Sequence, residues 1–324
     1  MMVPAERPVA VIMTCYNEGP YIGEAVRSVL DQTRSDLIRE IVIADDGSAE
    51  DTRAALREIE SWDPRVRVMY EPGGNGVPRQ RCLAIAATSA PYLAILDGDD
   101  LWTPEKLGPQ VSLLDAKPDV GLVYGRFYTF PDGDIGAAQL APTLDITGDE
   151  DLARTYFLND PPIIPSTILL RRTAYEASGG FDPDVRVFED TDFFLRIASF
   201  TRFAFVAEPV LYKRNRTTSI TGGRKDLMAY HAFVALRAAA KDPALLPLVP
   251  GRLAERARKL ANQQFIAGNA DEARALSALG VRLAPFAAGN WVSWALARLP
   301  SGVAVHLLRT VFSRKVNTLP SGRS

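Results

Sequence analysis

The feature that most constrains the fold is an alternation of short apolar runs with segments of helical period in the first hundred residues. One such segment is apolar at steps of three and four residues from Ile22 to Leu30, which is typical of a helix with one buried face. Apolar strands separated by helices indicate a mainly parallel sheet covered on both faces. We therefore expect an α/β, Rossmann-like fold. The predicted strands are Val9–Met13, Ile41–Ala44, Val66–Tyr70 and Tyr92–Leu96.

Polar and glycine-rich segments follow each of these predicted strands. In parallel sheets, ligands bind beyond the carboxyl ends of the strands, so these segments are expected to meet at one edge and form a site. They are Tyr16-Asn17-Glu18, Asp45-Asp46-Gly47, Gly74-Asn75-Gly76 and Asp97-Gly98-Asp99-Asp100.

The last of these segments favours a metal ion. Carboxylates crowded at a strand end repel one another unless a cation lies between them. Carboxylate oxygens suit Mg²⁺ or Mn²⁺, which typically take one or two protein carboxylates together with substrate phosphates. The alternative is a helix start, because Asp is a good N-cap and Pro104 follows shortly after.

Two further acidic segments each allow two interpretations. Asp45 and Asp46 are suited to accept hydrogen bonds from a base or a ribose, but they also fit a turn, with Ser48 and Asp51 as a capping box for the next helix. Glu189-Asp190-Thr191-Asp192 begins a predicted helix, so its acids either favour the helix dipole or include a general base.

Charge is unevenly distributed along the chain. Residues 1–208 hold 19 basic and 34 acidic residues, a net charge of −15, whereas residues 209–324 hold 18 and 5, a net charge of +13. The balance of −2 gives no reason to expect nucleic acid as a partner. The basic region either faces an anionic surface or is a solvated helical face. Cys15 and Cys82 are expected to be core residues.

Taken in order, these motifs resemble family 2 glycosyltransferases of the GT-A fold. The resemblance covers roughly residues 7–220. It rests on Val11 to Glu18, Asp45 to Ser48, Asn75-Gly76 with Arg79 and Arg81, Leu96 to Trp102, and Gly179 to Asp182 ahead of Glu189 to Asp192.

The resemblance implies that the donor is a nucleotide-diphosphate sugar, with a UDP-sugar expected first and a dTDP- or GDP-sugar as the alternatives. It implies that the acceptor is a hydroxyl of a glycan, of a lipid-linked molecule or of another compound. It implies that Asp190 is the catalytic base and that inversion accompanies a single displacement. Asp99 with Asp97 would hold Mn²⁺ or Mg²⁺. The nucleotide sugar would contact Thr14, Tyr16, Glu18, Asp45, Asp46, Arg79, Asp97, Gly98 and Asp99, and further diphosphate or acceptor contacts would come from Glu189, Arg214 and Arg216.

The sequence departs from the family at one point. Many relatives carry a Tyr-Arg-x-His segment whose His helps to hold the metal or the diphosphate, but here the segment is Tyr212-Lys213-Arg214-Asn215. Either the arginines hold the diphosphate, or the metal is bound more weakly.

We expect a GT-A catalytic domain over residues 1–222, with a nucleotide-sugar half to about residue 117 and an acceptor half from about 118. Residues 223–324 are expected to form a helical extension. Its tryptophans, apolar residues and arginines, from Trp291 to Lys315, fit either an interfacial membrane helix or helices packed on the catalytic domain or on a second subunit. With no signal peptide or membrane span predicted, the expected location is the cytoplasm, at the inner face of the membrane if the extension binds it.

Two rival functions stay open at this point. A sugar nucleotidyltransferase shares the layered fold, but it needs a glycine-rich loop containing lysine where this chain has Tyr16-Asn17-Glu18-Gly19-Pro20. An inactive sugar-nucleotide or glycan-binding protein has no need of Asp97, Asp99 and Asp190 together. The acceptor side is expected around residues 131–170, with Pro161 to Ser166 as its lining.

Overall fold

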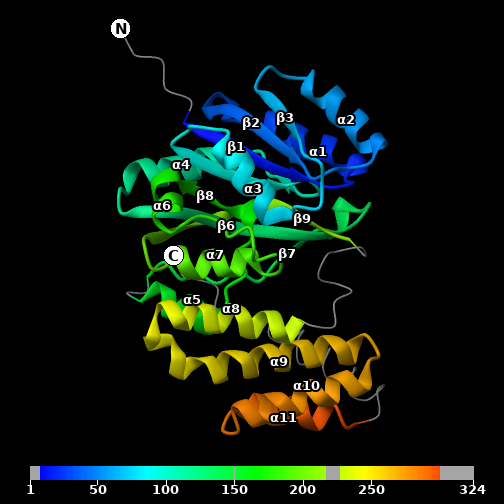
Figure 1. Cartoon of the computed structure of the whole chain (residues 1–324), viewed down its shortest axis with the longest axis vertical. Coiled ribbons are helices and arrows are strands. Elements are labelled where there is room, and N and C mark those ends of the chain that lie inside the picture. The colour runs from blue at the N-terminus through cyan, green and yellow to red at the C-terminus, as the bar shows by residue number, and fades with distance from the viewer. Residues whose placement is uncertain (1–7, 149–150, 217–226, 300–324) are drawn as a thin grey trace. The chain divides into compact units, whose positions relative to one another are not determined.

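The computed structural model describes residues 8–148, 151–216 and 227–299 (Figure 1). The chain divides into two compact units, Met1–Gly223 and Arg224–Ser324. The first unit contains one mixed sheet with the strand order β3-β2-β1-β4-β8-β6-β9-β5, and β7 pairs with β6.

Four parallel strands form the first half of this sheet. Thr14 of β1 is level with Asp97 of β4, and Cys15 of β1 is level with Asp45 of β2, so three strands end at one edge. The expected α/β arrangement is therefore confirmed here. The strands are β1 (Val9–Cys15), β2 (Ile38–Asp45), β3 (Val66–Tyr70) and β4 (Tyr92–Asp97).

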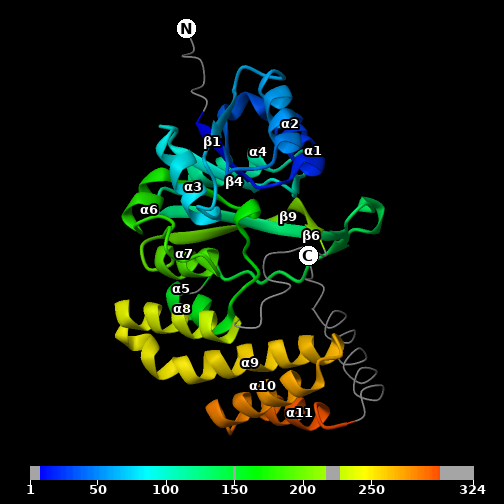
Figure 2. The ribbon, with the colours of Figure 1, turned by 45° about the vertical axis from the view of Figure 1, so that its right-hand side comes forward.

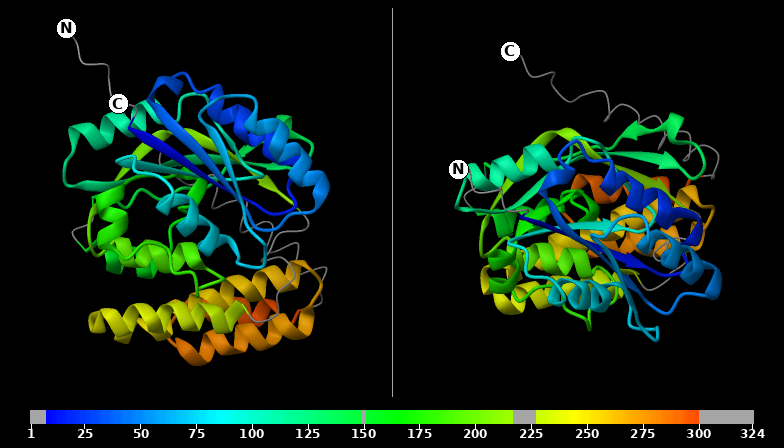
Figure 3. Two further views of the ribbon diagram at one scale, coloured as in Figure 1. Left: turned by 45° about the horizontal axis from the view of Figure 1, so that its top comes forward. Right: turned by 90° about the horizontal axis from the view of Figure 1, so that it is seen from above.

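Helices cover both faces of these strands (Figures 2 and 3). α1 (Gly19–Leu30) and α2 (Glu50–Glu60) pack together on one face, and α3 (Val77–Ala86) packs against β1 and β2. Alternate residues of β1 share a core cluster with α1 and α2, as the period of a strand requires. This cluster includes Val9, Val11 and Met13 of β1, Ile22 and Val26 of α1, and Leu56 of α2.

The second half of the sheet mixes strand directions. β8 (Leu169–Arg171) is antiparallel to β4 and β6 (Val120–Pro131), and β6 is parallel to β9 (Arg202–Asn215). Residues 203–206 and 210–212 both belong to this one long strand, β9. Its register against β6 shifts near Pro209, a residue without the N–H that a regular ladder needs. The short strands are β5 (Leu101–Trp102) and β7 (Gln139–Leu140).

Four helices accompany this second half: α4 (Leu107–Ala116), α5 (Leu152–Asn159), α6 (Arg172–Ala177) and α7 (Glu189–Ile197). α7 is the helix that carries the predicted base. It is held by aromatic contacts, with the Phe193 ring 4.3 Å from that of Phe181 and the Phe194 ring 5.9 Å from that of Tyr156 of α5.

The second unit is helical as expected. α8 (Leu227–Lys241), α9 (Val249–Ile266) and α10 (Ala270–Leu283) are followed by α11 (Ala288–Leu296), and α9, α10 and α11 pack against one another. Within residues 8–148, 151–216 and 227–299, no helix combines the length and the apolar character that crossing a membrane requires. The predicted interfacial residues from Val303 to Lys315 lie outside the described residues.

Candidate active site

Three carboxylates gather where β1 and β4 end. Glu18 follows β1, Asp97 ends β4, and Asp99 lies in the turn after it. Gly98 lies between the two aspartates, where a Cβ atom would come within 2.3 Å of the Glu18 Oε2 and 2.9 Å of the Thr14 carbonyl oxygen. Only glycine therefore lets the acidic turn approach Glu18 this closely.

The three carboxylates repel one another. The pKa of Glu18 lies well above its ordinary value because of burial first, and then because of the charges of Asp99 and Asp97. Burial, followed by the charge of Asp97, likewise raises the pKa of Asp99. Arg216 offsets part of this charge, with its Nη1 3.0 Å from the Asp99 Oδ2 and 3.5 Å from the Glu18 Oε1. This excess of negative charge, with hard oxygen donors, fits a divalent cation.

No complete metal centre is preformed in the part of the chain that the structure describes. There, no group of three or more His, Cys, Asp or Glu side chains is arranged to hold a metal ion. The assignment of Asp97 and Asp99 to Mn²⁺ or Mg²⁺ therefore stays a prediction, and substrate phosphates would have to supply further ligands.

Asp100, the last acid of the turn, has a structural role. It is buried, its Oδ2 accepts a hydrogen bond from the Ser166 hydroxyl at 2.8 Å, and its Oδ1 accepts one from the Arg214 backbone N–H at 3.0 Å. Burial, with the charge of Asp97, raises the pKa of Asp100 to about 7. Ser166 also accepts from the Asp97 N–H at 3.1 Å, so this fully buried serine supports the turn rather than lining an open acceptor face.

Asp45 and Asp46 are both committed to protein partners. The Asp45 carboxylate is fully buried and accepts from the Arg53 Nε at 2.9 Å and from the Ser48 N–H. Asp46 accepts from the backbone N–H groups of Asn75 at 3.0 Å and Gly76 at 2.8 Å, and from the side chain of Gln80 at 2.7 Å. A contact between Asp45 and the base remains a prediction that requires the carboxylate to change partners, whereas Asp46 shapes the glycine loop.

The expected capping box at Ser48 is wrong. The residue before α2 is Ala49, and no side chain caps that helix. The Ser48 hydroxyl instead accepts from the Asn17 N–H at 2.9 Å, while the Asn17 side chain accepts from the Ala49 N–H at 2.8 Å. Asn17 adopts a left-handed conformation, with φ at 55°, that lets it make this exchange. The loop after β1 is thereby fixed to the loop after β2.

Of the other predicted nucleotide contacts, Thr14 is buried at the end of β1, and Tyr16 is exposed just beyond it. Arg79 lies on α3 and is exposed. In the part of the chain that the structure describes, none of the three side chains makes a hydrogen bond or ion pair with the acidic turn, so their roles stay predictions.

Arg81, two residues after Arg79, was missed as a site residue. Its guanidinium is 3% exposed and donates to the Asp97 Oδ1 at 2.7 Å and to the Glu189 Oε1 at 2.9 Å. It therefore joins the acidic turn to the start of α7. The sequence did contain a signal, because Arg81 shares a helical face with Pro78 and Ala84, which are buried.

Asp190 lies in the first turn of α7, beside Glu189. Phe188, with φ at 58°, turns the chain into the helix, and the Asp190 Oδ1 accepts from the Thr191 N–H at 2.6 Å. Burial raises the pKa of Asp190, and burial followed by the charge of Asp190 raises the pKa of Glu189 to about 7. Asp192, in contrast, pairs with Arg196 at 2.8 Å within the helix.

The end of β9 supplies two arginines on either side of Asn215. The guanidinium groups of Arg214 and Arg216 lie 4.8 Å and 4.7 Å from the centre of the Tyr21 ring. The Arg214 Nε donates to the Asp99 carbonyl at 3.0 Å, and Asn215 is exposed. In the segment where relatives carry His, Arg214 therefore binds the backbone of the acidic turn and Arg216 binds its Asp99 carboxylate.

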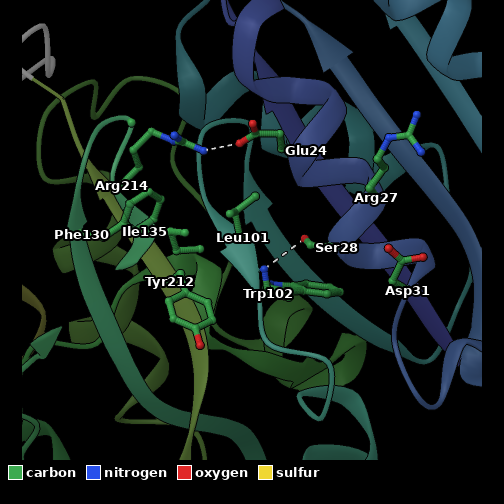
Figure 4. Close-up of a pocket in the computed structure, with 11 residues that line it drawn as sticks. Glu24, Arg27, Ser28, Asp31, Leu101, Trp102, Phe130, Ile135, Tyr212 and Arg214 are labelled. Atoms are coloured by element: carbon green, nitrogen blue, oxygen red, sulfur yellow. Dashed lines mark hydrogen bonds and ion pairs between the residues drawn. The ribbon is translucent and has the colours of Figure 1, made fainter. Parts of the chain in front are cut away.

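Arg214 also borders a cavity of about 500 Å³ (Figure 4). Glu24 of α1 accepts from the Arg214 Nη2 at 2.6 Å, and Ser28 accepts from the Trp102 N–H at 3.0 Å across the same hollow. Arg214 thus contacts both this cavity and the backbone of Asp99. The remaining lining is Arg27, Asp31, Leu101, Phe130, Gly133, Ile135 and Tyr212.

Comparison with known proteins identifies the class to which this sheet and acidic rim belong. A family model described as Glycosyl transferase family 2 matches residues 10–179, more than half of the chain. The S. aureus TarS 1–349 structure in complex with UDP-GlcNAc superposes with a TM-score of 0.61 at 16% identity, covering 89% of this chain and 90% of that one. The fold is therefore GT-A.

Two curated relatives agree with this match. The putative teichuronic acid biosynthesis glycosyltransferase TuaG of Bacillus subtilis is 37% identical over 106 residues, which are 33% of this chain and 41% of that protein. The UDP-Glc:alpha-D-GlcNAc-diphosphoundecaprenol beta-1,3-glucosyltransferase WfgD of Escherichia coli is 30% identical over 134 residues, or 41% and 51%. The matches thus span about half the length of these relatives. The chain belongs to glycosyl transferase family 2.

Proposed function

We propose that this protein is an inverting glycosyltransferase that moves a sugar from a UDP-sugar to a hydroxyl of a glycan or lipid-linked acceptor in glycoconjugate synthesis. The observation that carries the proposal is the ion-pair bridge from Asp97 through Arg81 to Glu189. It links the acids expected at the donor to the helix that carries the expected base, Asp190.

In this reaction the acceptor oxygen attacks the anomeric carbon from the face opposite the diphosphate. Asp190 takes the proton of the attacking hydroxyl, and its raised pKa makes it a stronger base than an ordinary aspartate. Arg216, and Arg79 if it turns inward, would offset the charge that develops on the leaving diphosphate. A single displacement inverts the configuration at that carbon.

Asp99 and Asp97 would hold the divalent cation, with Glu18 beside them. Bound there, Mn²⁺ or Mg²⁺ supplies Lewis-acid stabilisation of the departing diphosphate. The repulsion among these carboxylates supports the assignment, because a cation would relieve it.

Uridine is favoured as the donor base because TarS has been solved with UDP and with UDP-GlcNAc, and WfgD is named for UDP-Glc. WfgD is also named for a diphosphoundecaprenol-linked acceptor, which supports a lipid-linked acceptor here. Such an acceptor would place this protein at the inner face of the membrane, with contact through the basic helical unit.

Thermal unfolding tests the donor class. Each of UDP, GDP, dTDP and CDP is added with Mn²⁺ or with a chelator. A nucleotide at a hundred times its dissociation constant adds about 2.7 kcal/mol to the stability of the folded state. We expect UDP to stabilise the protein only with metal. If GDP or dTDP stabilises the protein instead, the nucleobase of the donor is guanine or thymine rather than uracil.

An inactive binding protein remains the second candidate, and turnover separates it from a transferase. Release of UDP from a UDP-sugar that depends on an added acceptor supports transfer. Metal-dependent binding of UDP without any turnover, across acceptors of the lipid-diphosphate sugar class, would favour the binding protein.

A further inference from the structure

The last described helix, α11, buries two polar side chains and exposes two large apolar ones. Asn290 and Ser293 face inward and are buried. The Asn290 side chain donates to the carbonyls of Gly280 at 3.0 Å and Ala284 at 3.2 Å, and Ser293 donates to the Asn262 Oδ1 at 3.0 Å. α11 is thus fastened to the unit through these hydrogen bonds and through Leu296, which packs against Phe265, Ala273 and Ala297. Its other large apolar side chains include Trp291 and Val292.

Those large side chains face outward. Trp291 is 47% exposed and Val292 is 57% exposed, and Phe286, in the turn before the helix, is 100% exposed. Leu299, after the helix, is also exposed. We call Phe286, Trp291, Val292 and Leu299 the outer apolar face. Exposed large apolar side chains concentrated in one short segment indicate an interaction site.

The charges nearest to the outer apolar face in the sequence are basic. The sequence has no charged residue between Arg282 and Arg298, which flank the face at its two ends. The Arg298 guanidinium lies 3.7 Å from the centre of the Trp294 ring. The described residues 227–299 include nine basic and four acidic residues, a net charge of +5. The complementary partner is therefore anionic as well as apolar.

We propose that the outer apolar face inserts into the interface of an anionic phospholipid membrane. Tryptophan and phenylalanine beside arginines suit the boundary between headgroups and acyl chains. α11 has nine residues, about 14 Å of helix, which is short for the roughly 800 Å² that each partner buries in a standard protein interface. A few inserted side chains with flanking arginines are sufficient for reversible membrane contact.

The proposal rests on the proposed function in one respect, because a lipid-linked acceptor requires the enzyme to work at a membrane. It assigns that contact to the described turn and helix at residues 284–299, rather than to basic charge spread over the whole unit.

The test is flotation of the full chain with vesicles of phosphatidylcholine and phosphatidylglycerol, and with vesicles of phosphatidylcholine alone, in the absence of donor and acceptor. The variant Phe286→Ser/Trp291→Ser should bind the anionic vesicles at least about tenfold more weakly than the wild type. Leu246→Ser is the matched control, since Leu246 is similarly exposed in the same unit. It should bind as the wild type does.

Arginine variants measure the electrostatic contribution to vesicle binding separately from the apolar one. Arg282→Gln and Arg298→Gln should each weaken binding to anionic vesicles about fivefold at low salt, and should have no effect on binding to neutral vesicles. Unchanged melting temperatures would show that these variants remain folded.

Three results would overturn the proposal. The wild type fails to float with anionic vesicles, the double variant floats as well as the wild type, or the double variant instead changes the oligomeric state. The last result would make the outer apolar face a contact between copies. Because the assay involves no catalysis, its failure leaves the transfer reaction untouched, and Phe286→Ser/Trp291→Ser should still use a short, soluble acceptor.

Discussion

The two halves of the catalytic sheet position their polar residues in different ways. In the parallel half, Glu18, Asp45 and Asp97 each lie at or just beyond the end of a strand, and the register of β1 with its neighbours brings them to one edge. In the mixed half, Asp190 lies on a helix, and Arg214 and Arg216 lie at the end of a bulged strand. The first arrangement follows from local pattern, and the second depends on long-range packing.

Hydrogen bonds and ion pairs join the two halves at many points, including the acids of the site. Arg81 links Asp97 to Glu189, and Asp100 holds both Ser166 and the Arg214 backbone. The comparison teaches that the acids of the parallel half divide by the origin of their partners: Asp45 and Asp46 bind donors of their own half, whereas Asp99 and Asp100 bind donors of the mixed half. The following experiments test that division.

The largest effect is expected for Asp190→Asn. Loss of the base should lower the transfer rate by about 10²- to 10⁴-fold, while metal-dependent UDP binding stays close to that of the wild type. Steady-state kinetics and a UDP titration measure the two. Asp184→Asn, at an exposed position in the preceding loop, is the control. Near-normal turnover in Asp190→Asn would contradict the assignment of Asp190, in the mixed half of the sheet, as the catalytic base.

Arg81→Gln and Arg79→Gln form a pair on one helix. Removing Arg81 leaves Asp97 and Glu189 without their shared cation, which should cost about 3–5 kcal/mol of stability. Arg79 is exposed, and its replacement should change stability by no more than about 0.5 kcal/mol while weakening diphosphate binding. Urea unfolding and UDP titration measure these effects. Equal stability of the two variants would contradict the bridge.

The pH dependence of transfer distinguishes the two neighbouring acids of α7. A base must be deprotonated, so activity should be lost as the pH falls through the raised pKa of Asp190, by about tenfold per pH unit below it. If Asp190 alone determines this acidic limb of the pH–activity profile, the Glu189→Gln variant shows the same limb. If the limb lies near pH 7 and disappears in Glu189→Gln, the titrating group is Glu189.

The smallest effect is expected for Asn215→Ala. Asn215 is exposed, and Arg216 reaches Asp99 instead, so metal-dependent UDP affinity should change by about 0.5 kcal/mol or less. Arg216→Gln provides the contrast and should weaken UDP binding more. If Asn215→Ala loses more metal-dependent UDP affinity than Arg216→Gln does, Asn215 contributes to the metal site.

Much of the parallel half was predictable, because apolar strands and amphipathic helices have periods that are visible in the sequence. Val66–Tyr70 was predicted with the bounds that the structure has. Short elements such as β8 and α6 were not, since a three-residue strand leaves no period to recognise.

The sequence by itself determined the alternation of strands and helices and the polar rim at the strand ends, whereas the close approach of Glu18 to Gly98 is seen only in the structure. Only the tertiary structure decided which acids are committed to the protein. Asp100 directly follows Asp99 in the sequence, yet its partners, Ser166 and Arg214, come from distant segments. Asp45 and Asp46 are likewise held by the protein, through Arg53 and the glycine loop. A carboxylate's role depends on the donors that folding brings within hydrogen-bond distance, and that information is not local.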